Sequence, residues 1–137
     1  MIKLIIFDLD GVLVDTKKIH YDALNFALEK FKSEKISFTD HLKIYDGLPT
    51  SKKLQILYRK KKIIKSNFSK IKKYKQYLTK KLLKESLKED KKLIQIFKYL
   101  KKKNYKIGIA TNAIKSTLNI CLGKLKISKF IDIKFSN

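Results

Sequence analysis

The chain of 137 residues has no tryptophan, one proline, one methionine and one cysteine, Cys121. A single cysteine cannot close a disulfide within the chain or build a cysteine metal cluster, and this usage indicates a reducing compartment, the cytoplasm. No apolar run is long enough to cross a membrane, and the first residues enter a predicted strand at once, leaving no room for a signal peptide. The composition therefore argues against a disulfide-stabilised secreted domain and predicts no membrane partner.

Acidic residues are also scarce, with 12 against 34 basic residues and a formal net charge of +22. Lysine runs within 60–62, 72–75, 80–84 and 101–103, with tyrosines between them, favour a basic module that follows a phosphate backbone. Against that hypothesis, every basic residue except Arg59 is a lysine. Only arginine among the basic side chains can bind a base edge through two parallel hydrogen bonds, so the chain has little capacity to recognise a specific sequence. The lysines are spread over most predicted helices, as on a solvated face. We therefore expect weak, nonspecific attraction to RNA and no specific nucleic-acid partner.

The chain does contain apolar material, 44% of its residues, which suffices for one sizeable core. Three runs have the length and composition of buried strands, at 2–7, 105–110 and 131–135. Amphipathic helical patterns at 91–102 and 116–124 precede the second and third of these strands. Alternating strand, helical crossover and strand predicts right-handed βαβ units, a parallel sheet and an α/β fold.

Two carboxylates follow the first predicted strand directly. Strand side chains alternate between faces, so Asp8 and Asp10 project to the same side if extended backbone persists beyond Phe7. Gly11 then lets the backbone turn. In such a pair one carboxylate can attack phosphorus while its neighbour protonates the leaving group and activates water, and a hard cation such as Mg²⁺ suits oxygen ligands. An Asp-rich turn after a purely structural strand is the alternative interpretation.

The second predicted strand ends in a hydroxyl and an amide, Thr111 and Asn112. Ligands of open α/β sheets bind beyond the carboxyl ends of the strands, so Asp8 and Thr111 meet there if their strands are neighbours. Taken alone, this pair fits a helix cap as well.

The string FDLDGVLVDT, residues 7–16, resembles the first motif of the haloacid dehalogenase superfamily of phosphohydrolases, and residues 105–112 resemble its second motif. The resemblance implies that Asp8 is the nucleophile and a metal ligand, and that Asp10 is the acid/base whose carbonyl also contacts Mg²⁺. It implies that Thr111 and Asn112 hold the transferring phosphoryl group. Aspartate at both positions of the first motif resembles the phosphatase and phosphomutase branch. The implied fold is a Rossmann-like parallel sheet with an inserted α-helical cap.

Residues 16–88 contain no convincing strand, and by resemblance they form the cap, while 1–15 and 89–137 form the core. His20 stands at the spacing seen in β-phosphoglucomutase-like members, in which a histidine at this position contributes to proton transfer near the catalytic acid. By the same resemblance, Gly47 lies in the segment of the cap that faces the substrate. A packing histidine and a plain helix-start turn are the alternatives. Helical stripes are expected to pack in cores; they comprise Ile19, Ala23, Phe26, Ala27 and Phe31, then Leu54, Leu57 and Tyr58, then Ile71, Tyr74, Leu78 and Leu82, and finally Leu93, Ile96, Phe97 and Leu100.

The superfamily's third motif, a lysine, and its fourth, an acidic pair, follow the third strand, and no residue of this chain is assigned to either. We interpret the chain as the amino-terminal portion of a hydrolase, with the core truncated after its third strand. The predicted function is a Mg²⁺-dependent phosphatase that acts on a small phosphorylated metabolite through an aspartyl phosphate, inactive as this portion. A β-phosphoglucomutase-like sugar phosphomutase, a basic nucleic-acid-binding module and a catalytically dead remnant are the alternatives. The sequence predicts no particular substrate or oligomeric state.

Overall fold

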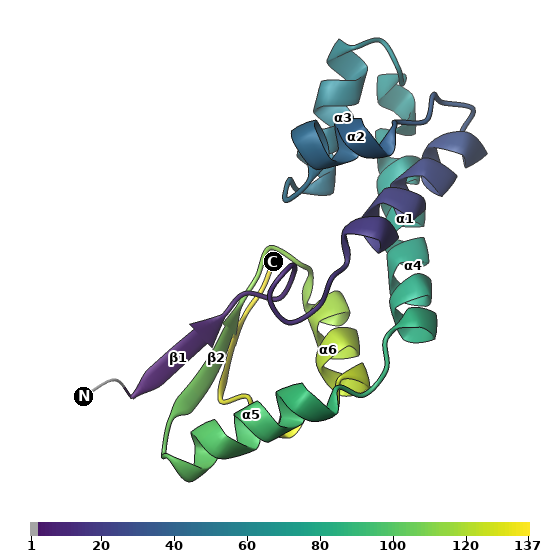
Figure 1. Cartoon of the computed structure of the whole chain (residues 1–137). Coiled ribbons are helices and arrows are strands. Elements are labelled where there is room, and N and C mark those ends of the chain that lie inside the picture. The colour runs from purple at the N-terminus through teal and green to yellow at the C-terminus, as the bar shows by residue number, and fades with distance from the viewer. Residues whose placement is uncertain (1–2) are drawn as a thin grey trace. The chain divides into compact units, whose positions relative to one another are not determined.

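The computed structural model describes residues 3–137, which form two compact units (Figure 1). An α/β unit combines the chain up to Thr16 with Leu83–Asn137, and a helical unit comprises Lys17–Leu82. The division at Thr16 and Leu82 does not by itself show what the helical unit does. Its assignment as a cap stays a prediction.

The α/β unit is built on three parallel strands in the order β1-β2-β3. They are β1 at Leu4–Phe7, β2 at Lys106–Ala110 and β3 at Ile133–Phe135. The helix α5 at Lys91–Lys102 precedes β2, and α6 at Lys115–Lys124 with the 3₁₀ turn η3 at Ser128–Phe130 precedes β3. Two right-handed crossovers that step in the same direction place α5 and α6 on the same side of the sheet, as Figure 1 shows.

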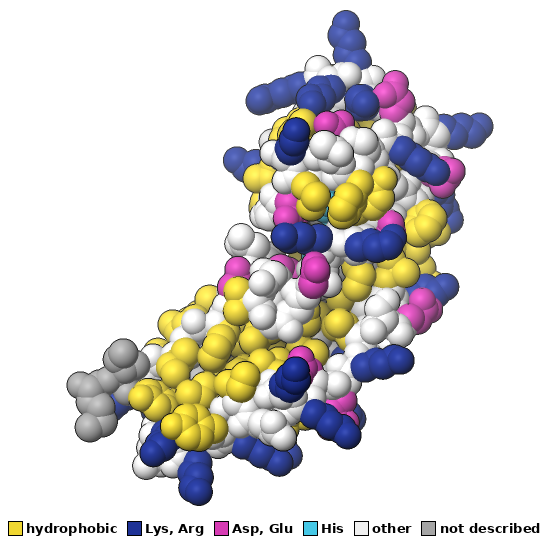
Figure 2. Space-filling model, in the orientation of Figure 1, with side chains coloured by type: hydrophobic (Ala, Val, Ile, Leu, Met, Phe, Trp, Pro, Cys, Tyr) yellow, Lys and Arg dark blue, Asp and Glu magenta, His cyan; other side chains and the backbone are white. Residues whose placement is uncertain are grey.

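The core of the α/β unit lies between the sheet and these helices. Ile107 and Ile109 of β2 are fully buried on that side. The ring of Phe7 lies 5.2 Å from that of Phe97 in α5, and Phe97 lies 6.3 Å from Phe130. The opposite face carries exposed apolar side chains, among them Leu4 and Ile6. In Figure 2, apolar side chains gather over the part of the molecule that holds β1 and β2.

The helical unit encloses a core of its own. Its elements are α1 at Lys17–Lys30, α2 at Phe38–Asp40, the π-helical turn η1 at His41–Tyr45, α3 at Thr50–Arg59, the 3₁₀ turn η2 at Lys65–Asn67, and α4 at Phe68–Ser86, whose last turn is grouped with the α/β unit. Asn25 of α1 fixes the loop after that helix, because its amide both donates to and accepts from the backbone of Ile36 at 2.9 Å. The buried apolar side chains are Leu24, Ala27, Leu28, Ile36, Tyr45, Leu54, Leu57, Ile63 and Ile71.

The fold class predicted from the sequence is confirmed, with all three strands parallel. Among the described residues, 16–88 form no strand of the sheet. The first strand was predicted from Ile2 and begins at Leu4, with Ile2 outside the described residues. No described helix has the length and apolar character needed to cross a membrane.

Three predicted core positions were wrong, since Phe26, Tyr58 and Ile96 are exposed. On α1 the buried residues Ala23, Leu24, Ala27 and Leu28 span roughly 140° of the helix at 100° per residue, and Phe26 points outside that arc. The spacing of apolar residues predicted this helix correctly, but the buried side of the helix faces away from Phe26.

Candidate active site

Asp8 and Thr111 leave the sheet at the same edge. Asp8 directly follows β1, and Thr111 directly follows β2. The two strands are paired in parallel, with Phe7 opposite Ile109, so Asp8 lies level with Ala110 in the continued register. The neighbouring strands required by the sequence argument are therefore present, and they bring a carboxylate and a hydroxyl to one carboxyl edge.

A tight loop turns the chain between the two aspartates and α1. The amides of Leu13 and Val14 donate to the carbonyl of Leu9 at 3.0 and 3.1 Å, and the Gly11 amide donates to Val14 at 2.7 Å. Gly11 has φ +80°, a conformation that costs a side chain energy, and this explains the glycine after the second aspartate. Leu9 and Leu13 anchor the loop in the core, because both are buried.

The two carboxylates differ in their surroundings. Asp8 is exposed, and its Oδ1 accepts the Leu9 amide at 2.6 Å. Asp10 is half-buried, and its Oδ1 accepts a short hydrogen bond from the hydroxyl of Thr16, which is itself buried. Thr16 thus holds the Asp10 carboxylate from across the loop. The sequence interpretation gave Thr16 no role of its own, although it closes the first motif.

Thr111 is placed by backbone bonds on both sides. Its amide donates to the carbonyl of Phe135 at 3.0 Å, and its Oγ1 accepts the amide of Ala113 at 3.1 Å. The Thr111 hydroxyl proton is not used in that bond and can be donated to an incoming oxygen. The Asn112 carbonyl accepts the side chain of Asn137 at 3.1 Å. The helix α6 begins three residues after Asn112, and the amino end of a helix favours anions.

The other two predicted site residues lie in the helical unit. His20 of α1 is half-buried, and its Nδ1 lies 3.2 Å from Nζ of the buried Lys75 in α4. A lysine ammonium has only protons to donate, so Nδ1 accepts and Nε2 carries the ring proton. Gly47 is exposed, with φ +71°, in the turn between η1 and α3. No sequence signal singled out Lys75, which sits in a run of lysines.

A second histidine, His41, is completely buried in the helical unit, and neither ring nitrogen has a hydrogen-bond partner among the described residues. Its ring packs edge-on against Tyr21 at 5.5 Å and stacks on Phe38 at 6.2 Å. Burial, followed by the positive charge of Lys53, lowers the pKa of His41 to about 4, against smaller opposing effects from Asp46 and from the nearby backbone of Lys17. The imidazole is therefore neutral at physiological pH.

The carboxylates supply oxygen ligands of the kind that Mg²⁺ prefers, but few of them. Among the described residues no group of three or more His, Cys, Asp or Glu side chains is arranged to hold a metal ion. Asp8 and Asp10 therefore fit part of a magnesium site. Cys121 adds no ligand, because burial, and then the nearby charge of Asp10, raises the pKa of its thiol to about 12.

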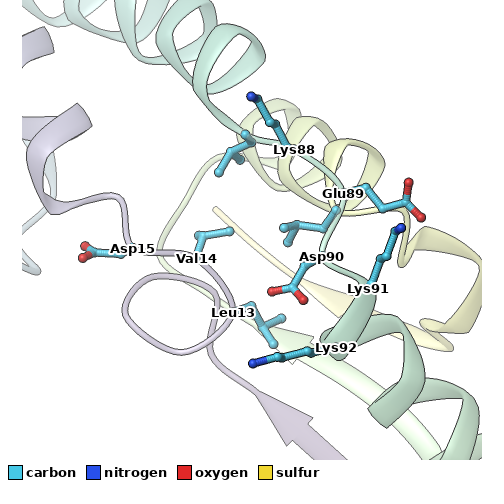
Figure 3. Close-up of a pocket in the computed structure, with 10 residues that line it drawn as sticks. Leu13, Val14, Asp15, Lys88, Glu89, Asp90, Lys91 and Lys92 are labelled. Atoms are coloured by element: carbon cyan, nitrogen blue, oxygen red, sulfur yellow. The ribbon is translucent and has the colours of Figure 1, made fainter.

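A hollow of about 560 Å³ in the α/β unit is separate from this carboxyl edge. Figure 3 shows Leu13 and Val14 opposite Glu89, Asp90 and Lys92, with Leu87 and Leu125 also in its wall. The Asp90 carboxylate is engaged as the cap of α5, accepting the Leu93 amide at 2.9 Å. Asp8, Asp10 and Thr111 are not among the described residues that line the hollow.

Most of the chain is similar to known proteins. A family profile described as haloacid dehalogenase-like hydrolase matches residues 5–136. A phosphorylated carbohydrates phosphatase of Thermotoga maritima is 28% identical over 131 residues, which are 94% of this chain and 58% of that protein. The chain thus spans less than two thirds of the length of this relative.

Solved structures show the same fold. A β-phosphoglucomutase of Clostridium difficile is 26% identical with a TM-score of 0.77, over 98% of this chain and 61% of its own. CbbY of Rhodobacter sphaeroides, solved in complex with phosphate, is 15% identical with a TM-score of 0.86, over 100% of this chain and 64% of its own. The second likeness concerns the fold alone.

Proposed function

The chain belongs to the haloacid dehalogenase-like hydrolases, and we propose that it carries the nucleophile and phosphate-binding parts of a phosphatase site for a small phosphorylated metabolite. One observation carries the proposal. Asp8 follows β1 and Thr111 follows β2, and these paired parallel strands end at the same edge. A nucleophilic carboxylate and a donor for the phosphoryl oxygens must stand side by side, and neighbouring strand ends supply that arrangement.

The chemistry assigned to these residues is a double displacement at phosphorus. The Asp8 carboxylate attacks phosphorus, and the bond to the ester oxygen breaks as that oxygen takes a proton from Asp10. Asp10, now a carboxylate, removes a proton from water, whose oxygen attacks the aspartyl phosphate and restores Asp8. Inorganic phosphate leaves. Thr111 and Asn112 hold the phosphoryl oxygens throughout.

Thr16 is a positioning residue in this scheme. Its hydroxyl donates to Asp10 Oδ1, which fixes the orientation of the carboxyl group. Mg²⁺, held by Asp8 and the Asp10 carbonyl, would neutralise phosphate charge and orient the substrate. The cysteine usage supports a cytoplasmic location for this enzyme.

A sugar phosphomutase is the second candidate, favoured by the contact of His20 with Lys75. The buried ammonium group of Lys75 fixes the orientation of the His20 imidazole, a group that can take part in proton transfer. Incubation with a hexose phosphate separates the two activities, because a phosphatase releases inorganic phosphate whereas a mutase yields an isomeric sugar phosphate.

The Asp8→Asn variant tests the proposal against Asp22→Asn, which removes a carboxylate paired with Lys18 on α1. Asp22 is partly buried in the helical unit and is not one of the proposed site residues. Phosphate release from a panel of sugar phosphates, measured with concentrated protein, should vanish in Asp8→Asn and persist in Asp22→Asn. Equal release by both variants would overturn the assignment of Asp8.

A further inference from the structure

The solvent-facing side of α4 carries a stripe of basic and aromatic side chains. Lys70, Lys73, Tyr77, Lys80 and Lys81 fall within an arc of roughly 100° at 100° per residue. Lys80 is half-buried and the others are exposed. Ile71 and Thr79, on the opposite side of the helix, are buried in the helical unit. We name Lys70, Lys73, Tyr77, Lys80 and Lys81 the α4 stripe.

Two tyrosine rings form a platform beside these lysines. The rings of Tyr74 and Tyr77 stack at 6.0 Å with an interplanar angle of 27°. The side chain of Lys30 in α1 lies over the Tyr74 ring, 4.2 Å from its centroid. Lys70 lies about one turn before the tyrosine pair and Lys81 about one turn after it, so aromatic rings alternate with positive charge along the helix.

The charge of the stripe is not neutralised within the protein. No acidic residue occurs between Asp46 and Glu85, a segment that includes α3 and almost all of α4. No ion pair of the described residues involves the lysines of the stripe. Lysines three and four residues apart on a helix repel each other, whereas solvated helices ordinarily alternate the two signs. A polyanion bound along the stripe would relieve this repulsion.

We propose that the α4 stripe, with Tyr74 and Lys30, binds single-stranded nucleic acid without sequence specificity. The lysines contact phosphates, and the exposed Tyr77 ring stacks on a base, the combination by which such surfaces hold single strands. A membrane surface fits less well, because Ile71 is buried in the core of the helical unit and Phe68 and Tyr74 pack against that core, which takes up much of the apolar side of α4. The inference is independent of the phosphatase chemistry.

The chain provides its own matched comparison on α5. Lys98, Lys102 and Lys103 are exposed, and Lys103 lies over the Tyr99 ring at 5.9 Å. Tyr99 is 60% exposed and Tyr77 58%. The α5 set therefore has similar charge and ring exposure, but Tyr99 has no tyrosine stacked against it among the described residues. If lysine abundance alone attracted nucleic acid, both sets would contribute equally.

The experiment measures binding of a fluorescent 15-nucleotide oligo(U) by anisotropy as a function of salt. Four variants of the 137-residue chain are compared with wild type: K70Q/K73Q/K81Q and Tyr77→Leu on α4, and K98Q/K102Q/K103Q and Tyr99→Leu at α5 and its carboxyl end. Circular dichroism establishes that each is folded. Glutamine keeps helix propensity, and the two triple variants lose the same charge.

Wild type should show a slope of log K against log salt of about −3, since each phosphate contact contributes roughly −0.7 for a single strand. The α4 triple variant should lose about two units of that slope and at least about tenfold affinity at low salt. Tyr77→Leu should weaken oligo(U) by about fivefold or more but leave binding of heparin, a polyanion without bases, unchanged. Both α5 variants should bind as wild type does.

Equal losses in the α4 and α5 triple variants would overturn the inference in favour of a diffuse charge effect. An oligo(U) affinity that Tyr77→Leu leaves unchanged would remove the stacking role and with it the proposed site. Binding of phosphatidylserine vesicles in the absence of oligo(U) binding would assign the stripe to a membrane surface instead.

Discussion

At the scale of single residues, the hydroxyl of Thr16 distinguishes the two aspartates of the first motif. It donates to the Asp10 carboxylate, whereas the exposed Asp8 carboxylate accepts the backbone amide of Leu9. A half-buried carboxylate that is oriented by a hydroxyl is suited to proton transfer, while an exposed one is suited to attack. The difference arises from the loop around Gly11, which returns Thr16 to Asp10.

Replacing Thr16 with valine should slow phosphoryl transfer by about 10- to 100-fold, because Asp10 loses its orienting donor. Thr16→Ser keeps the hydroxyl and should retain most of the activity. Single-turnover rates of the two variants, with substrate affinity measured separately, check this. A Thr16→Val variant as fast as wild type would contradict the role of the hydroxyl, because valine keeps the methyl group of threonine and lacks only the hydroxyl.

The buried His41 should make the protein less stable as pH falls. Its folded-state pKa of about 4 is below the ordinary 6.5. Between these values the unfolded chain binds more protons, so the free energy of unfolding falls as pH drops from about 6.5 toward 4, by up to about 3 kcal/mol. Lys53 and His20 oppose protonation, and Asp46 favours it.

Urea denaturation at several pH values checks this, with His41→Phe as the control, since an aromatic ring suits the contacts with Tyr21 and Phe38. The variant should lose most of the pH dependence in this window. A wild-type stability that stays constant from pH 6.5 to 4.5 would contradict the account.

At the scale of elements, the strands and their order were predictable because short apolar runs and helical crossovers leave few arrangements. The proximity of Asp8 and Thr111 could be predicted in the same way, because each residue directly follows a strand and the two strands are neighbours. His41 and Lys75 could not be predicted in this way. The residues that surround them come from other helices, and near each of them the sequence shows only a polar residue within a helical pattern, which does not distinguish a buried position from an exposed one.

Two glycines of the α/β unit should respond oppositely to alanine. Gly11→Ala should destabilise the protein by about 1 kcal/mol, because φ is +80° there. Gly123→Ala lies within α6 and should stabilise it by about 0.5–1 kcal/mol through helix propensity. An added Cβ meets no atom within 4 Å at either position, so backbone conformation alone decides the sign. Urea midpoints shifted in the same direction by both variants would contradict this.

At the scale of the whole molecule, the chain covers 58% of the Thermotoga phosphatase and 61% of the Clostridium mutase. The family resemblance implies a charge-stabilising lysine and a second acidic pair, and we assign neither role to a residue within 1–137. Each missing electrostatic group costs roughly 10²- to 10³-fold. From a typical turnover of about 10 per second, the 137-residue chain should therefore fall to about 10⁻³ per second or less.

Steady-state phosphate release at saturating Mg²⁺, with contaminating phosphatase removed, checks the expected low turnover. Calorimetry should show weak Mg²⁺ binding, since Asp8 and Asp10 supply only part of a ligand set. Turnover near one per second that depends on Asp8 would show that the groups absent from residues 1–137 are dispensable or come from another chain.

The central claim, that Asp8 is the nucleophile, is tested most directly by trapping its phosphorylated form. Protein incubated for hours with acetyl phosphate and Mg²⁺ is quenched in acid and mapped by peptide mass spectrometry, because even slow chemistry accumulates a covalent product over that time. The account predicts one hydroxylamine-labile phosphoryl group on Asp8, absent from Asp8→Asn and retained in Asp22→Asn. A label on another residue, a label that survives in Asp8→Asn, or no label at all would contradict it.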